Sequence, residues 1–228
     1  FDGDAGSGGT LVSQAIVRTI AHCYRHTWLG YCAKGDPKAV HWRNMYPANI
    51  TRAEAKARAA QLTTTSYHVT VDLTGSATTF TSTSTISFTS LAGTTFVDLL
   101  ADSIVEATLD DAPLDVSSYT GERLEVELAE GAHVLAITAV CRYSNTGEGL
   151  HRFVDPVDDR VYCYTQLEVA DARRVYACFD QPDLKATFAL SVIAPAHWTV
   201  LSNSPEVEPL VAGELGRWHV GRRRRHAD

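Results

Sequence analysis

Apolar and polar residues alternate with a period of two over much of the chain after residue 62. Segments 67–73, 80–88 and 124–128 each place their apolar residues at every second position, with Thr, Ser, Glu or Arg between them. Alternation of this kind is typical of β-strands with one buried and one solvated face. The stretch 78–95 is rich in Ser and Thr, but the regular spacing of Phe80, Ile86 and Phe88 favours a strand over low-complexity sequence.

Two further segments, 134–140 and 188–193, are apolar on both faces, which predicts that they lie in a packed interior. Turn-forming residues separate these segments at short intervals. Many strands at such spacing, with almost no helical pattern after residue 62, predict an all-β fold, an antiparallel β-sandwich.

One helix is predicted before the first strand. Thr51 and Glu54 have the spacing of a capping box, and residues 53–62 are rich in Ala, Glu, Lys, Arg and Gln, which are strong helix formers. We therefore divide the main part of the chain into an N-terminal helix segment, 45–62, and a β-sandwich domain, 63–219.

The charge and composition of the 228 residues exclude several classes of protein. The formal net charge of −7 disfavours a general nucleic-acid binder. No apolar run approaches the roughly 18 residues of a membrane-spanning helix. The N-terminus lacks the pattern of a secretory signal. The five cysteines form no even framework, which favours reduced thiols in a cytoplasmic protein, with Cys141, Cys163 and Cys178 as small core residues.

Both ends of the chain differ from its middle in charge. Residues 1–44 and 221–228 are net positive, residues 45–220 are strongly negative, and the single methionine is Met45. We interpret 1–44 as a non-native or disordered leader and 220–228 as an aberrant or disordered basic tail. The alternatives are a metal tract in the leader and a polyanion signal in the tail, and these rest on the residues His22, Cys23, His26, Cys32 and Arg222–Arg225.

Candidate chemistry lies between residues 145 and 168. The glycine-rich segment 145–153 lacks the pattern of a phosphate-binding loop and is predicted to be a structured turn. Gln166 and Glu168 are two residues apart, so in an extended segment their side chains point the same way. A carboxylate beside an amide suits a ligand with an ammonium group. A nucleophilic Cys163 or Cys178 is an alternative, and for Cys163 the partner would be His151, which is supported only by proximity in sequence.

Three longer segments carry a resemblance. Segments 143–156, 164–176 and 179–188, with a shorter match over 45–56, are together similar to the N-terminal domain of the aminopeptidase N family, in its actinobacterial cytosolic form. The resemblance covers residues 45 to 219. It implies a saddle-like β-sandwich that packs on a catalytic domain of a monomeric zinc metalloaminopeptidase. It also implies that Gln166 and Glu168 help bind the α-amino group and first residue of peptides with a free N-terminus, and that Asp180, Pro182 and Asp183 are structural, with the two carboxylates capping backbone or pairing with Arg173 or Arg174.

The same resemblance indicates which motifs of the family this chain lacks. The family's zinc site uses an H-E-x-x-H motif, and none of the nine histidines here is followed by Glu. The G-x-M-E-N segment is also absent. We therefore expect no catalytic residue and no metal ligand in this chain, and a fragment that is inactive alone because the reading breaks near Val220. A standalone β-sandwich module that binds peptides or proteins is the alternative, and an independent cysteine hydrolase is a third hypothesis.

Overall fold

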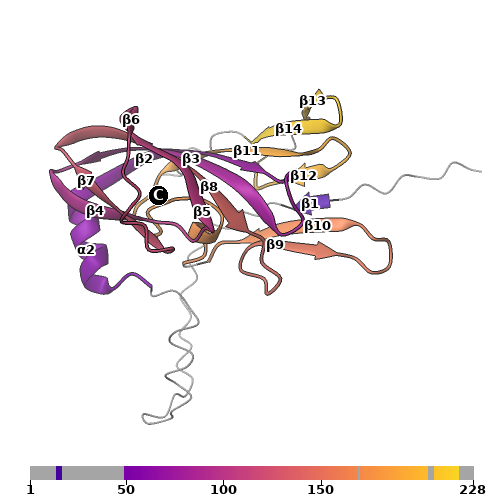
Figure 1. Ribbon diagram of the computed structural model, residues 1–228, viewed down its shortest axis with the longest axis horizontal. Helices are drawn as coiled ribbons and strands as arrows, with labels where there is room; N and C mark the ends of the chain where they lie inside the picture. The colour runs from indigo at the N-terminus through magenta and orange to yellow at the C-terminus, as the bar shows by residue number, and fades with distance from the viewer. Residues whose placement is uncertain (1–13, 17–48, 169, 205–207, 221–228) are drawn as a thin grey trace, which may run out of the picture.

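The computed structural model describes residues 14–16, 49–168, 170–204 and 208–220, which form fourteen strands, one α-helix and one 3-10 helix (Figure 1). The helices are α2 (Arg52–Gln61) and η1 (Ala172–Arg174). The strands are β1 (Gln14–Ile16), β2 (Leu62–Asp72), β3 (Thr79–Ser90), β4 (Gly93–Asp98), β5 (Ser103–Leu109), β6 (Ala112–Pro113), β7 (Arg123–Leu128), β8 (Gly131–Arg142), β9 (Gly149–Val154), β10 (Val161–Gln166), β11 (Thr187–Pro195), β12 (Thr199–Leu201), β13 (Leu210–Ala212) and β14 (Leu215–Val220).

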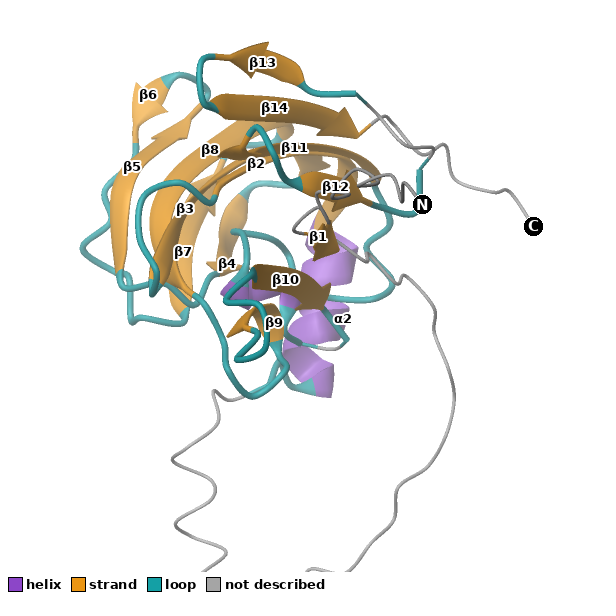
Figure 2. Ribbon diagram, turned by 90° about the vertical axis from the view of Figure 1, so that its right-hand side faces the viewer, coloured by secondary structure: helices purple, strands orange, loops and turns teal. Residues whose placement is uncertain are grey.

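These strands form three sheets. The largest has eight strands in the order β13-β14-β11-β2-β3-β8-β5-β6, a second has the order β12-β1-β10-β9, and β4 pairs with β7. Figure 2 shows the large sheet curving over the smaller sheets and α2. The prediction of a β-rich domain preceded by one short helix is confirmed. The large sheet is mixed, because β11 runs parallel to β2 while its other pairs are antiparallel.

The buried faces of the strands form a continuous core. In β3 the apolar residues Phe80, Ile86 and Phe88 are all nearly inaccessible, as the alternation predicts. The same holds for the apolar residues of β2 and β7. Burial of these side chains against the smaller sheets is the main force that holds the layers together.

The two segments predicted to be packed on both faces are covered on one face. In β8, Leu135, Ile137 and Ala139 are buried, but Val134 is 43% exposed. In β11, Val192 is buried, whereas Ala189 and Ile193 on the opposite face are only half-buried. The prediction was wrong because no described element covers the outer face of the large sheet, so valine and alanine on that face stay partly in water.

Helix α2 begins where the sequence predicts. Thr51 and Glu54 form both hydrogen bonds of the capping box. The helix ends at Gln61 because Leu62, predicted as its last residue, is buried as the first residue of β2.

A buried arginine fastens this helix to the sheets. Arg58 is 2% exposed, and its Nη1 donates to Asp98 Oδ2 at 2.7 Å. Its Nε donates to Gln181 Oε1 at 3.0 Å, and its guanidinium lies 4.6 Å from the centre of the Phe96 ring. One side chain thus joins α2 to β4 and to the segment before β11.

The end segments are described only in part. Strand β1 lies between β12 and β10 and is parallel to both, and β14 reaches Val220. The other residues of the predicted leader and tail, including His22, Cys23, His26, Cys32 and Arg222–Arg225, lie outside the described residues, and the predictions about them stay predictions. Within the described ranges, no helix is long and apolar enough to cross a membrane.

Candidate functional site

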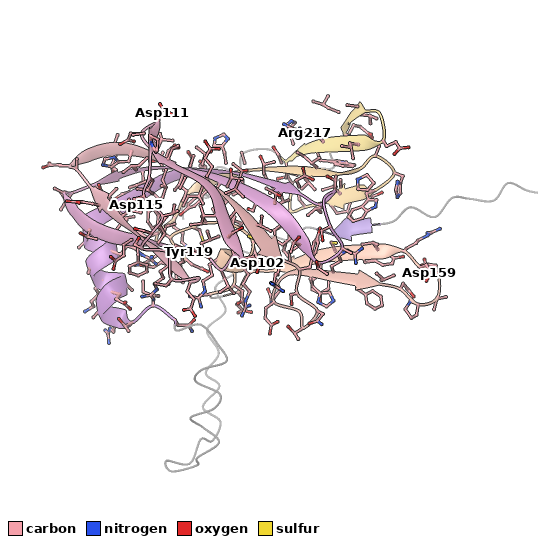
Figure 3. All side chains as sticks on the ribbon, in the orientation of Figure 1. Asp102, Asp111, Asp115, Tyr119, Asp159 and Arg217 are labelled. Atoms are coloured by element: carbon pink, nitrogen blue, oxygen red, sulfur yellow. The ribbon has the colours of Figure 1, made fainter. Side chains whose placement is uncertain are left out.

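The two candidate ligand-binding residues lie at the end of the β9–β10 hairpin that is attached to the body of the domain. Gln166 is the last residue of β10 and pairs with Gly149, the first residue of β9. The hairpin turns at the opposite end, where Figure 3 labels Asp159. The candidate site is therefore held between the small sheet and the segment that follows β10.

Gln166 and Glu168 are both exposed, with Glu168 in the turn directly after the strand. Among the residues that the structure describes, none forms a hydrogen bond or ion pair with either side chain. An exposed carboxylate and an exposed amide oxygen can together accept two N–H groups from a ligand. The site therefore has the chemistry to bind a cationic amine, and the predicted roles of these two residues stay predictions.

Arg174 borders this site through an unusually close contact with Gly149. Gly149 has a φ of +64°, and a Cβ placed there would lie only 2.7 Å from Arg174 Cβ. Arg174 comes from η1, and its Nε donates to Asp171 Oδ1 at 2.6 Å. Because Gly149 is the cross-strand partner of Gln166, glycine at 149 lets η1 pack directly beside the candidate residues.

Residues 145–148 form a structured turn, as predicted, but 149–153, which were predicted to belong to the same turn, are part of strand β9. Ser144 Oγ accepts hydrogen bonds from the backbone N–H groups of Thr146 and Gly147 at 3.1 and 3.2 Å. The Glu148 carboxylate accepts a hydrogen bond from the Thr146 hydroxyl. That bond, aided by the positive charge of Arg174, lowers the pKa of Glu148 below its usual value. The neighbourhood of Gln166 therefore has a further negative charge.

Asp180 has the structural role that was predicted for it, whereas the roles of Pro182 and Asp183 stay predictions. Asp180 Oδ2 accepts a hydrogen bond from the backbone N–H of Arg173 at 3.2 Å, so its carboxylate caps local backbone. Arg174 pairs with Asp171 rather than with Asp180.

Cys163 and His151 are not brought together. Cys163 pairs with Arg152 across the hairpin, whereas His151 pairs with Tyr164. Neighbouring positions on a strand point to opposite faces, so the thiol and the imidazole lie on different sides of the hairpin. Burial raises the pKa of Cys163 to about 11, which disfavours the thiolate that a nucleophile requires. Cys141 and Cys178 are also buried, as predicted for core residues.

The described residues do not form a metal site. Within 14–16, 49–168, 170–204 and 208–220, no group of three or more His, Cys, Asp or Glu side chains is placed to hold a metal ion. A zinc ion needs three or four such ligands in tetrahedral arrangement. The residues described here therefore do not fit a zinc site.

Comparisons with known proteins give the family to which the chain is similar. Residues 63–217 match the peptidase M1 N-terminal domain. The chain is 50% identical to aminopeptidase N of Streptomyces lividans over 167 residues, which are 71% of this chain and 20% of that protein. It is 32% identical to aminopeptidase N of Acetobacter pasteurianus over 132 residues, 54% of this chain and 35% of that protein. It is 41% identical to aminopeptidase N of Bos taurus over 59 residues, 26% of this chain and 6% of that protein.

The fold and the site define a β-rich domain that presents an amide and a carboxylate at one end of a small sheet. The chain belongs to the peptidase M1 N-terminal domain family, whose parent enzymes are zinc-dependent M1 aminopeptidases. It spans about a fifth of the length of the Streptomyces lividans relative.

Two features of the site were not found from the sequence. The contact between Gly149 and Arg174 depends on a positive φ and on a packing distance, and a glycine among several in one loop gave no signal of either. The side chains that share a face of β10 with Gln166 could have been found, because a period of two leads back from Gln166 to Tyr164 and Tyr162.

Proposed function

We propose that this chain is the N-terminal domain of a zinc-dependent aminopeptidase and that it binds the free α-amino group of peptide substrates through Glu168 and Gln166. The observation that carries the proposal is the pair of exposed, unpaired acceptor groups at the end of β10 in a domain of this family. The Glu168 carboxylate would take the positive charge of the ammonium group, and the Gln166 amide oxygen would accept a second N–H.

The zinc ion and the groups that carry out hydrolysis would belong to the rest of the parent enzyme, since the described residues fit no metal site. The domain's contribution is binding and orientation of the substrate, which raises the rate by holding the peptide in place. Alone, this chain would not hydrolyse peptides.

The proposal includes packing on the remainder of the parent enzyme. Leu210, Val211 and Leu215 of the β13–β14 edge are 68%, 60% and 42% exposed, and Val157 at the hairpin turn is 90% exposed. Exposed apolar residues grouped at sheet edges are typical of surfaces that another domain covers. The same surface would serve a partner protein if the domain acted as a standalone binding module.

A chimeric enzyme tests the role of Glu168. Residues 63–217 would replace the matching domain of the Streptomyces lividans aminopeptidase N, and hydrolysis of leucine p-nitroanilide would be measured. Glu168→Ala is expected to lower kcat/KM about 10- to 100-fold, the range for a lost hydrogen bond to a charged group. Glu127→Ala, which removes an exposed carboxylate from β7, is the matched control and is expected to leave kcat/KM within twofold.

Two results would contradict the proposal. Equal kcat/KM for the chimera and its Glu168→Ala variant would remove Glu168 from the binding site. Zinc-dependent hydrolysis by the 228-residue chain alone would show that the catalytic groups lie within it.

A further inference from the structure

The β9–β10 hairpin has two distinct faces. In the register of the pair, Leu150 lies opposite Thr165 and Arg152 opposite Cys163, and these residues are buried or half-buried. The other face has three successive cross-strand pairs, namely Gly149 with Gln166, His151 with Tyr164, and Phe153 with Tyr162. Gln166 is therefore one end of a row whose remaining pairs are aromatic.

The two rings of the pair next to Gln166 pack against each other. The rings of His151 and Tyr164 are stacked, with centroids 4.7 Å apart and planes inclined by 26°. A Cβ at Gly147 would lie 3.8 Å from Tyr164 Oη, so the glycine turn before β9 borders the ring at its hydroxyl end. Tyr164 is nevertheless 40% exposed. An aromatic ring that is fixed by its neighbours and open to solvent is suited to contact a ligand.

The spacing between this pair and Gln166 is similar to the distance between the ammonium group and the side chain of an amino acid. Side chains two residues apart on a strand are spaced by roughly 6 to 7 Å, so Tyr164 lies about that far from Gln166. A ligand whose ammonium group is bound by Glu168 and Gln166 has its first side chain within a similar distance. The negative charge of Glu168 fixes the charged end of such a ligand, and the rings offer an apolar surface to its side chain.

We propose that His151 and Tyr164 form a platform that contacts the side chain of the first residue of a bound peptide and favours aromatic or large apolar residues there. This inference rests on the proposed function, because it takes the ammonium group to be bound by Glu168 and Gln166. The platform is a specificity-determining contact and takes no part in the hydrolysis itself.

The test is an NMR titration of the 228-residue chain with L-phenylalaninamide, L-alaninamide and N-acetyl-L-phenylalaninamide. The backbone amide of Glu168 and the ring signals of Tyr164 and His151 are followed. L-phenylalaninamide is expected to shift both sets of signals. Tyr164→Ala is expected to weaken L-phenylalaninamide binding about threefold to tenfold, the range for a lost aromatic contact, and L-alaninamide binding less than twofold.

Two matched variants accompany the titration. Tyr164→Phe keeps the ring and is expected to bind both amides within twofold of the original chain, which shows that the ring rather than the hydroxyl makes the contact. Leu210→Ala removes an exposed apolar residue from β13 and is expected to change neither affinity.

The outcomes separate this inference from the function on which it rests. If both free-amine amides shift Glu168 but Tyr164→Ala weakens them equally or not at all, the platform is wrong and the amine site stands. If N-acetyl-L-phenylalaninamide shifts the Tyr164 ring as strongly as the free amine, the rings bind aromatics independently of the amine site, and the platform is again wrong. If no amide shifts Glu168, both proposals are overturned.

Discussion

Arg58 and Asp98 are each 2% exposed and bonded to one another, whereas Gln166 and Glu168 lie on the surface without a partner among the described residues. In the sequence the two pairs look alike, because each consists of polar residues that stand among apolar ones. The protein itself satisfies the first pair, which makes it part of the architecture. The second pair keeps its bonding capacity for something else, and this difference separates a structural polar group from a candidate ligand site.

Breaking the buried pair is expected to cause the largest loss in the free energy of unfolding. Arg58→Ala leaves the Asp98 carboxylate buried without its main counter-charge, and breaking a buried ion pair in this way costs about 3 to 5 kcal/mol. Urea unfolding followed by circular dichroism measures the free energy of unfolding. Arg52→Ala, on the exposed side of the same helix, is the control and should change it by less than about 0.5 kcal/mol. A loss below about 1 kcal/mol for Arg58→Ala would mean that Asp98 finds enough support elsewhere, for instance from Arg123, whose Nε lies 3.7 Å from Asp98 Oδ1.

The sequence predicted most of the fold, and of these two polar pairs it singled out only the exposed one as a candidate. Period-two alternation identified β2, β3 and β7 and their buried faces, because each strand has one wet face. The Arg58–Asp98 pair could not be predicted, since its residues are 40 positions apart and arginine in a helix is ordinarily solvated. Gln166 and Glu168 could be proposed from the sequence because two residues of one segment suffice to define them, while the position of their neighbour Arg174 depends on how η1 packs.

A glycine substitution tests the packing beside the candidate site. Gly149 and Gly213 have almost the same backbone, with φ of +64° and +63°, but a Cβ at Gly213 would meet nothing within 4 Å. Gly213→Ala should therefore cost only the strain of a left-handed residue, about 1 to 2 kcal/mol. Gly149→Ala adds the clash with Arg174 and should cost about 1 kcal/mol more in the same urea measurement.

The double variant Gly149→Ala/Arg174→Gly decides whether Arg174 causes this cost. It keeps the methyl group at 149 but removes the whole side chain at 174, including the Cβ that lies 2.7 Å from it. Unfolding free energies of the four proteins form a double-mutant cycle, and a coupling near zero would contradict the contact.

The pair formed by buried His133 and half-exposed Asp110 is intermediate between these two cases, and it is expected to have the smallest effect on stability. His133 is 7% exposed, and both ring nitrogens face acceptors, with Nδ1 2.7 Å from Asp110 Oδ2 and Nε2 3.0 Å from Ala129 O. Burial lowers the pKa of His133, but the two hydrogen bonds and the charge of Asp110 outweigh it, so the pKa is raised. The pKa of Asp110 is lowered, because hydrogen bonds from Val134 N–H and from His133 outweigh its desolvation.

The sign of the pH dependence follows from these directions. The stabilisation from His133 is fully present below the pKa of about 6.5 of an unfolded histidine and is lost as pH rises through the raised folded value. The stabilisation from Asp110 is present above the pKa of about 3.9 of an unfolded aspartate and is lost as pH falls through the lowered folded value. The pair therefore stabilises the domain most between about pH 4 and 6.5.

His133→Gln removes this dependence. The difference in unfolding free energy between the original chain and the variant should be larger at pH 5.5 than at pH 8.5. The change should be below about 1 kcal/mol, because Asp110 is about half exposed and its charge is screened. An NMR titration of the His133 ring, with exposed His68 as a reference signal in the same sample, follows the same event directly. Equal differences at the two pH values would show that His133 does not titrate with folding.

The parallel pairing of β11 with β2 also has a consequence for how the domain is made. Partner residues in this pair, such as Val69 and Leu190, are about 120 positions apart. At a synthesis rate of about 5 to 20 residues per second, one edge of β2 would wait roughly 6 to 24 s for its partner on a translating ribosome. During that interval a strand with a Tyr-Val-Val face has an open edge, so the nascent chain, rather than the finished domain, is the state most in need of a chaperone.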